Sequence, residues 1–418
     1  GTVPADQRRR ERTLFYQLFK KIGVGEEALK GVNSSNGTKV LWKATFEGEG
    51  GMDAGGLYRD SVREMCAELQ SPAAGGLRLL IPTPNQRFGV GAGMDRWLLN
   101  PLRRDKEDLD MLCFLGLLMA AAMRHGSALE LDLSPLVWKP LLGQEASWAD
   151  LVAADEGWCG EVSRCRAVSD PAAWAELGKV WTVSASWGGA AELRRGGSRM
   201  PVAFSDRDEY LDACVAFRLK ESAKQVEAVR GGLLRRIGTN VLPFVDWREV
   251  ERMVCGTPEI DVAQLERMTS YGDNMPGGRS HKIADMFWRV MGSLSNQERA
   301  LFVAFAWGRK RLPSQPGDAH LKLVVDRSLN DAHLPRSHTC FFVVDLPDYS
   351  SEAVMRDKLL YAIRHCSAID MDSSALGALR DEDAEEDARL RREEEESESL
   401  VTFEALCDDA AESAAAAA

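Results

Sequence analysis

The chain reads Leu-Pro-Arg-Ser-His-Thr-Cys-Phe-Phe-Val-Val-Asp-Leu-Pro-Asp-Tyr from residue 334 to residue 349. Turn-forming and small polar residues precede Cys340, and a short apolar run, Phe341 to Val344, follows it and ends before Pro347. This pattern predicts a buried strand with Cys340 at the junction between a loop and that strand. The sheet would fix the backbone while the sulfur stays accessible, as a nucleophile requires. These residues alone are also compatible with Cys340 as a packing residue at the strand end, because free cysteine is among the most buried residue types.

A family resemblance extends from this run along most of the chain. The pattern Leu-Pro-x-x-x-Thr-Cys-Phe, followed by Leu-Pro-x-Tyr, strongly resembles the active-site segment of HECT-type ubiquitin ligases. Further similar segments follow in the family's order: Phe46–Asp60, Phe114–Gly143, Glu192–Gly197, Tyr210–Arg230 and Ala300–Pro313. Within the family, Ile81–Asn85, Trp307–Pro313 and Cys366–Asp370 are most similar to the large HERC-type ligases. Those ligases carry this domain at their C-terminus, so we expect the chain to be the catalytic part of a longer protein.

The resemblance implies an α+β fold of two lobes. A mainly helical N-lobe would span residues 1–256 and carry a small projecting subdomain, residues 144–247, that binds the ubiquitin-conjugating enzyme. A smaller α/β C-lobe, residues 257–375, would carry the catalytic cysteine, and residues 376–418 would form an acidic, disordered tail. Gly256 and Pro258 fit this boundary, because glycine relieves backbone restriction and proline stops the preceding helix. We expect the segment Gly256–Pro258 to be the hinge between the lobes.

Apolar periodicity predicts where the helices and strands lie. The run from Met111 to Met123 is expected to be a core helix, because its 13 residues are too few to span a bilayer. Residues 144–205 form the least regular region, with tryptophans scattered among Gly, Ser and Ala. The other predicted helices are Leu57–Leu69, Asp208–Ala228, a helix starting at Trp247, Asp261–Met268, Ala284–Ser293 and Ser351–His365. The other predicted strands are Leu41–Phe46, Leu321–Val325 and the run after Cys340.

The resemblance makes Cys340 the nucleophile that carries ubiquitin as a glycyl thioester. A thiol is intrinsically very nucleophilic, and exchange between thioesters is nearly thermoneutral, so positioning matters more than a strong base. In an extended segment His338 would point to the same side as Cys340, which makes it a candidate general base. Arg311 is a candidate for stabilising the thiolate or the developing oxyanion. Thr339 is expected to be a hydrogen-bonding neighbour.

Tyr210 and Cys214 lie four residues apart on a predicted helix and therefore share a face. In the family these positions line the groove that binds the conjugating enzyme, although Cys214 replaces an aromatic residue common there. Ordinary core packing explains the same spacing, so both interpretations stay open at this point.

Two other classes of function compete with a ligase. A cysteine hydrolase acting on ubiquitin would need a histidine oriented by Asp or Asn, and six histidines without a supporting motif do not favour it. A catalytically weak module that binds ubiquitin or the conjugating enzyme would lose the thiol or the Trp-Gly-Arg-x-Arg-Leu-Pro run, and both are present. The expected partners are therefore ubiquitin, a ubiquitin-conjugating enzyme and protein substrates.

Composition argues against several other functions. The nine cysteines are scattered without paired spacing, which indicates free thiols in a reducing compartment and predicts no metal site. Gly89–Gly93 lacks the Lys-Ser/Thr of a phosphate loop, so neither nucleotide nor any other cofactor is predicted. Nothing near Gly1 resembles a signal peptide, and no apolar run is long enough to span a membrane. We expect the protein in the cytoplasm, and in the nucleus as well.

The net charge of −12 belongs to one end of the chain. Of the 64 acidic and 52 basic residues, 15 and 3 respectively lie within residues 381–418, so the remaining 49 acidic and 49 basic residues balance. A solvated tail is the simplest interpretation, and a docking segment for basic partners is the alternative. Arg8–Arg10 is a basic cluster without a wider basic face, so nucleic acid is not an expected partner. Near Ile369 the chain lacks the aromatic residue that anchors the C-lobe in many HECT domains.

Overall fold

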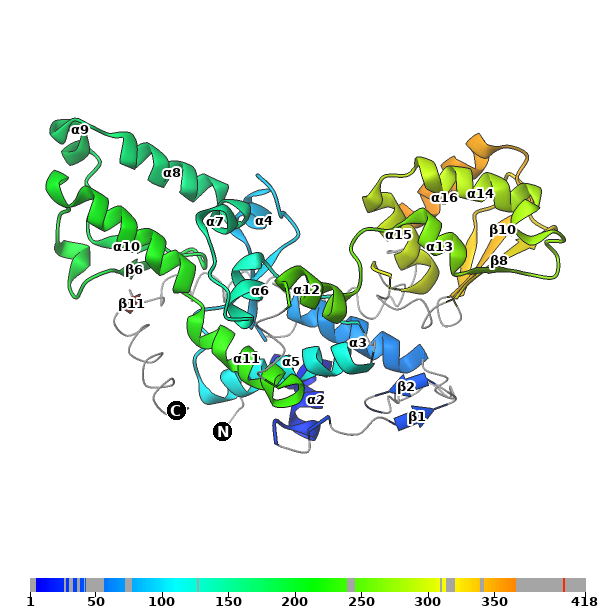
Figure 1. The fold of residues 1–418 in the computed structure, drawn as a ribbon, viewed down its shortest axis with the longest axis horizontal. Helices are drawn as coiled ribbons and strands as arrows, with labels where there is room; N and C mark the ends of the chain where they lie inside the picture. The colour runs from blue at the N-terminus through cyan, green and yellow to red at the C-terminus, as the bar shows by residue number, and fades with distance from the viewer. Residues whose placement is uncertain are drawn as a thin grey trace.

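A computed structural model gives the structure of the chain. It describes residues 5–25, 28–29, 33–35, 38–40, 42, 56–71, 77–125, 128–238, 245–308, 310–312, 320–338, 342–365 and 401–402. These residues are mainly helical with several small sheets (Figure 1), so the predicted mixture of α and β structure is confirmed.

Buried apolar side chains form three clusters, which we name by their place in the chain. The N-terminal core comprises buried residues between Phe15 and Leu142 and between Val226 and Cys255. The inserted core comprises those between Val162 and Phe217, and the C-terminal core those between Ile260 and Ile363. The inserted core thus interrupts the N-terminal core in sequence.

The N-terminal core is built around one long apolar helix, α5. Its helices are α1 (Ala5–Arg12), α2 (Leu14–Ile22), α3 (Gly56–Leu69), α4 (Pro84–Phe88), α5 (Lys106–His125), α6 (Pro135–Leu141), α11 (Ala223–Ile237) and α12 (Trp247–Cys255). Two antiparallel hairpins accompany them: β1 (Asn33–Ser35) with β2 (Thr38–Val40), and β3 (Leu80–Pro82) with β4 (Trp97–Leu99). The predictions of α3 and of the core helix α5 are confirmed, and α5 is longer at both ends than the apolar run.

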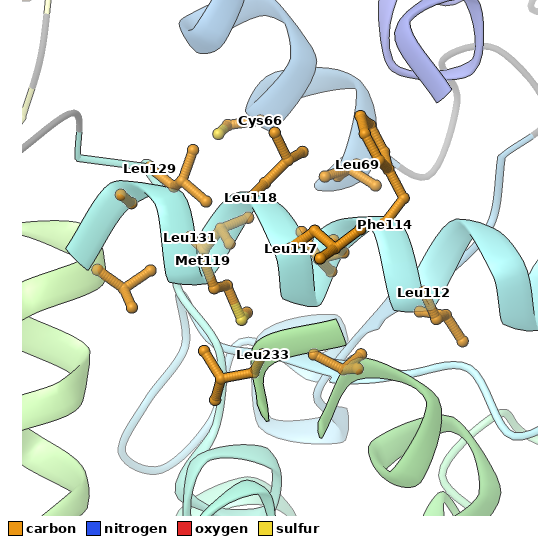
Figure 2. Packing of buried hydrophobic residues seen from close by; sticks show 14 of the residues in the cluster. Cys66, Leu69, Leu112, Phe114, Leu117, Leu118, Met119, Leu129, Leu131 and Leu233 are labelled. Carbon is orange, nitrogen blue, oxygen red and sulfur yellow. The ribbon is translucent and has the colours of Figure 1, made fainter. Parts of the chain in front are cut away.

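Helix α5 is buried on several sides because other helices cover it. Figure 2 shows Cys66 and Leu69 of α3 on one side of α5 and Leu233 of α11 on the other. Helices α5 and α11 cross at Gly116 and Gly232, where an added Cβ on either glycine would collide with the backbone carbonyl of the other helix. The absence of side chains at the crossing therefore lets the two backbones touch.

The inserted core is regular, which contradicts the expectation of an irregular region. The segment that forms it contains α8 (Glu156–Ala167), α9 (Pro171–Glu176), α10 (Arg207–Lys220), β5 (Thr182–Ser184) and β6 (Ala190–Glu192), and α7 (Trp148–Ala154) precedes it. Its short helices start at side-chain caps, as at Asp170, whose carboxylate accepts from the backbone of Ala172 and Ala173. Trp174 and Trp181 are buried in this core. The tryptophans that look scattered in sequence are thus its packing residues.

The single helix predicted for Asp208–Ala228 is wrong, because α10 ends at Lys220 and α11 starts at Ala223. Tertiary contacts at the break explain the difference. The Ser222 hydroxyl donates to the Leu99 carbonyl at 2.8 Å, and the Glu221 carboxylate accepts from the Ser186 backbone N–H at 3.2 Å. These bonds stabilise a bend that the helical periodicity does not reveal.

Within the predicted tail, residues 401–402 form β11 (Val401–Thr402). This strand pairs in parallel with β6, whose other edge pairs with β5. These two residues thus touch the inserted core, while the rest of residues 376–418 lies outside the described residues and the expectation of a disordered tail stays a prediction.

The C-terminal core follows α12, which ends at Gly256. Its helices are α13 (Val262–Arg267), α14 (Lys282–Ser293), α15 (Asn296–Trp307) and α16 (Glu352–His365), and its strands are β7 (Thr269–Tyr271), β8 (Leu321–Asp326), β9 (Arg336–His338) and β10 (Val343–Pro347). The sheet has the order β7-β8-β10-β9, with β9 antiparallel to β10 and the other neighbours parallel. The predicted α12, α13, α14, β8 and α16 are confirmed within a few residues.

Two further observations complete the comparison with the predicted elements. None of the described helices is long and apolar enough to cross a membrane. The predicted strand Leu41–Phe46 lies outside the described residues, apart from Trp42.

Candidate active site

The segment Leu334–Tyr349 includes both strands of the hairpin of β9 and β10. His338 is the last residue of β9 and pairs with Val343, the first residue of β10. Thr339, Cys340 and Phe341 lie outside the described residues. The expected strand after the cysteine starts at Val343, two residues later than predicted, because Phe342 has a positive φ of 52°, which a strand residue does not adopt. The predicted roles of Cys340 and Thr339 therefore stay predictions.

Phe342 joins the motif to the segment that precedes it in the chain. Its ring is 3% exposed and stacks on Trp307, with ring centroids 5.0 Å apart and an interplanar angle of 15°. Trp307 ends α15 and belongs to the Trp-Gly-Arg-x-Arg-Leu-Pro run. The Cys340 motif and the Trp-Gly-Arg-x-Arg-Leu-Pro run thus meet in the C-terminal core, where stacking fixes Phe342, two residues after Cys340 in sequence.

His338 has a partner that the sequence argument missed. Its Nε2 lies 2.9 Å from Oδ2 of Asp345 on β10. The imidazole is about half exposed and the carboxylate is largely covered, with side-chain exposures of 54% and 23%. When the neutral ring donates from Nε2, its Nδ1 is the free acceptor. A β9–β10 hairpin in this register is the signal that could have predicted the pair, since Asp345 sits diagonally opposite His338.

Arg311 lies among acidic residues of the N-terminal core. Its Nη2 forms an ion pair with Asp132, and its Nη1 lies 3.6 Å from Oε1 of Glu251. The side chain is only 9% exposed. Desolvation opposes its charge, but the neighbouring Cys255, Asp132 and Glu251 together raise the pKa of Arg311, so the guanidinium stays charged. Cys340 lies outside the described residues, so the support of its thiolate by Arg311 stays a prediction.

The other described thiols are poor candidates for the nucleophile. The six described cysteines are all buried: Cys66, Cys113, Cys159, Cys165, Cys214 and Cys255. Burial raises the pKa of Cys159 to about 11, that of Cys214 to about 12 and that of Cys255 to about 12. A thiol that is neutral and covered reacts slowly with an incoming thioester.

Tyr210 and Cys214 line the same cavity in the inserted core. It has a volume of about 250 Å³, and its walls include Trp158, Leu177 and Val183. The Tyr210 hydroxyl donates to the Thr182 carbonyl at 2.9 Å, and its ring meets Trp181 edge-on at 5.7 Å. Burial raises the pKa of both Tyr210 and Cys214. The two side chains thus share a face as predicted, and they combine core packing with the lining of a cavity.

The remaining predicted residues lie at the end of α12. Gly256 has φ of +81°, which favours glycine, and its N–H closes the helix on the Arg252 carbonyl. Pro258 accepts a hydrogen bond from the Asn296 side chain through its carbonyl at 3.0 Å. In the described part of the chain, no group of three or more His, Cys, Asp or Glu side chains could hold a metal ion.

Comparison with known proteins places the chain in a family. The model of a family described as HECT-domain (ubiquitin-transferase) matches residues 81–372. The E3 ubiquitin-protein ligase HERC2 of Mus musculus is 37% identical over 371 residues, and that of Homo sapiens 36% identical over the same length. Each alignment covers 87% of this chain and 7% of the relative. The E3 ubiquitin-protein ligase TOM1 of Saccharomyces cerevisiae is 27% identical over 331 residues, 76% of this chain and 10% of that protein.

The family match thus spans the inserted core, the C-terminal core with its β9–β10 hairpin, and the N-terminal core from residue 81 on, while the chain corresponds to a small part of these relatives' length. The matched region is more than half of the chain. The chain belongs to the HECT-domain (ubiquitin-transferase) family.

Proposed function

We propose that the chain is a HECT-type ubiquitin ligase that receives ubiquitin from a conjugating enzyme on Cys340 and passes it to a substrate lysine. One observation carries the proposal: all six described cysteines are buried, whereas the family's active-site motif singles out the cysteine between β9 and β10. The relatives' printed names, E3 ubiquitin-protein ligases, support the same activity.

The first step exchanges one thioester for another. The Cys340 thiolate attacks the carbonyl carbon of the ubiquitin thioester, and a carbon–sulfur bond to Cys340 forms. The bond to the conjugating enzyme's sulfur breaks, and that sulfur leaves as a thiolate. No bond type changes in this step, so the barrier depends mainly on how the two sulfurs are brought together.

The second step forms an amide. The lysine amine attacks the Cys340 thioester, the amide bond forms and the Cys340 thiolate leaves. The amine loses a proton on the way, and His338 is the proposed acceptor through its Nδ1. The hydrogen bond of 2.9 Å between His338 Nε2 and Asp345 supports this role, because it leaves the other ring nitrogen free to accept.

We also propose the two-lobe organisation that the family resemblance implied. The N-terminal core with the inserted core would form the N-lobe, residues 1–256, and the C-terminal core would form the C-lobe, residues 257–375. The separation of the three apolar clusters supports this division. Gly256–Pro258 would then be a hinge, and residues 376–418 a tail that neither lobe requires.

The inserted core is the proposed docking site for the conjugating enzyme. The cavity beside Tyr210 and Cys214 supports this assignment, as do two exposed apolar side chains nearby, Leu177 and Met200, which are 44% and 41% exposed. Exposed apolar groups around a cavity are typical of a surface that another protein covers. Substrate recognition would lie in parts of the protein that correspond to the rest of its relatives' length.

A thioester assay tests the proposed function. Purified chain is mixed with conjugating enzyme that already carries ubiquitin, and the products are separated with and without reductant. A ligase forms an adduct between chain and ubiquitin that reductant removes. A hydrolase releases free ubiquitin, and a binding module leaves the charged conjugating enzyme unchanged; either of these two results would overturn the proposal.

A further inference from the structure

Among the described residues, two segments lie side by side where the N-terminal core meets the C-terminal core. One is the end of α12 at Gly256–Thr257, and the other is Lys310–Leu312. The Thr257 N–H donates to the Leu312 carbonyl at 2.9 Å, and the two residues form an isolated antiparallel bridge. A Cβ on Gly256 would lie 2.5 Å from the same carbonyl oxygen. The predicted hinge is therefore packed directly against a second stretch of chain.

The second segment, Lys310–Leu312, is held on the N-terminal core by ion pairs and a hydrogen bond. Arg311 pairs with Asp132, which precedes α6, and with Glu251 on α12. Glu251 also accepts from Arg96 at 2.6 Å, and the backbone N–H of Lys310 donates to the Glu130 carboxylate at 3.1 Å. Its neighbour Leu312 is fully buried in the C-terminal core. The segment is thus held on both sides of the joint.

Because Arg311 and Glu251 are buried, separating them from each other has a large free-energy cost. Side-chain exposure is 9% for Arg311 and 7% for Glu251, so water does not replace either of these two charges if they separate within this site, whereas Asp132, at 30%, keeps some contact with water. A buried charge without its partner is strongly destabilising, whereas an exposed ion pair contributes little. The joint therefore favours one arrangement of the two cores over others in which Arg311 is withdrawn.

We propose that Arg311 is a positioning residue: it latches Lys310–Leu312 to Asp132 and Glu251 and so fixes how the C-terminal core, with the Cys340 hairpin, faces the rest of the molecule. Figure 1 shows the C-terminal core, with β8, β10 and α14, at the opposite end of the view from α8 and α10. In this arrangement the hairpin is remote from the cavity beside Tyr210. The inference rests on the proposed function, since it gives the hairpin the acceptor cysteine.

A latch of this kind affects the two reaction steps unequally. Cys340 must meet the conjugating enzyme in the first step and a lysine in the second, and these encounters call for different arrangements of the cores. A contact that stabilises one arrangement changes its population and hence the balance between the two rates. A residue that only supports folding would lower both rates together.

The test compares three variants of the full chain. Arg311→Ala removes the latch, Arg311→Lys keeps a charge that can reach one carboxylate, and Arg289→Ala removes an exposed pair with Asp285 and Glu352 inside the C-terminal core. Small-angle X-ray scattering reports the arrangement of the cores without any reaction. Single-turnover assays report the rate of thioester formation and the rate of its discharge to free lysine.

We expect Arg311→Ala to change the scattering profile and to change the ratio of the two rates by about fivefold or more. Arg311→Lys should restore part of the scattering profile and part of the rate ratio of the unmodified chain. Arg289→Ala should match the unmodified chain in both measurements. An unchanged scattering profile, or two rates that fall in proportion, would overturn the latch. If no transfer is measurable in any variant, the proposed function fails and the scattering comparison alone decides the latch. Should Arg311→Ala not fold, Arg311→Lys against Arg289→Ala makes the same comparison.

Discussion

The assignment of Cys340 as the nucleophile requires that the other described thiols be poor nucleophiles. Cys255 lies at the end of α12, fully covered and beside both Arg311 and Glu251. Burial raises its pKa to about 12, although the Arg311 charge works in the opposite direction. Cys214 is similar, since burial raises its pKa to about 12 in spite of the nearby Lys179 and Tyr210. At neutral pH such groups are almost entirely protonated.

Alkylation of the native chain at neutral pH should therefore spare these thiols. Iodoacetamide reacts with thiolates, so we expect Cys159, Cys214 and Cys255 to stay unmodified until the chain is unfolded. Mass spectrometry of peptides from native and urea-treated samples measures this directly. Modification of Cys255 in the native chain at a rate like that of a free thiol would show that burial does not protect it.

The pair of His338 and Asp345 predicts a second effect at this scale. Asp345→Ala should slow discharge of the Cys340 thioester to free lysine by about tenfold, because the imidazole loses the partner that orients it. Formation of the thioester should change much less, since that exchange needs no strong base. Rates of both steps from single-turnover gels give the measurement.

Asp357→Ala is the matched control, because Asp357 is an exposed carboxylate on α16 in the same core. Equal slowing by both variants would mean that the Asp345 effect is general charge loss. Equal slowing of formation and discharge by Asp345→Ala would mean that the pair supports the hairpin and not the proton transfer.

Among the structural elements, the crossing of α5 and α11 shows what the sequence can and cannot predict. An unbroken apolar run was enough to predict that Met111–Met123 is a core helix, because no polar face is left for solvent. The break between α10 and α11 was missed, because Ser222 and Glu221 bond to residues far away in sequence. The pairing of Gly116 with Gly232 is likewise a tertiary contact, and no local pattern reveals it.

These glycines give a prediction with a built-in control. Gly116→Ala and Gly232→Ala should each lower the free energy of unfolding by about 1–3 kcal/mol or more, because the added methyl meets a backbone carbonyl. Gly231→Ala, one residue away on α11 and facing open space, should raise it by about 0.5–1 kcal/mol through helix propensity. Urea unfolding followed by tryptophan fluorescence orders the variants. A Gly116→Ala chain as stable as the Gly231→Ala chain would contradict the close crossing.

For the whole molecule, the sequence predicted where the chain passes from the N-terminal core to the C-terminal core. It did not predict which contacts hold the two cores together there. Gly256 and Pro258 stop the helix and mark where α12 ends, and this signal can be recognised from the sequence alone. The partner segment Lys310–Leu312 lies more than fifty residues further on, and Arg311 and Asp132 are 179 positions apart. Charged residues at such separations carry no local signal of pairing. The helices and strands of the C-terminal core were therefore more predictable than the contact that joins this core to the N-terminal core.

The acidic tail gives a test at the same scale. A chain ending at residue 380 should form the Cys340 thioester at close to the full rate, because the buried residues of all three cores precede residue 380. Any effect of the tail charge should weaken as salt rises, since the Debye length is about 8 Å at physiological ionic strength. A fall of more than tenfold, about 1.4 kcal/mol in the barrier, would contradict this and would make the pairing of β11 with β6 part of the working protein.

The central claim is that Cys340 carries ubiquitin, and replacing its sulfur by oxygen tests it most directly. With charged conjugating enzyme, the unmodified chain should give an adduct that reductant removes. The Cys340→Ser chain should give an adduct that survives reductant, because an oxygen ester has replaced the thioester, and Cys340→Ala should give none. An adduct on the Cys340→Ser chain that reductant still removes, or any thioester on Cys340→Ala, would place ubiquitin on another cysteine and contradict the account.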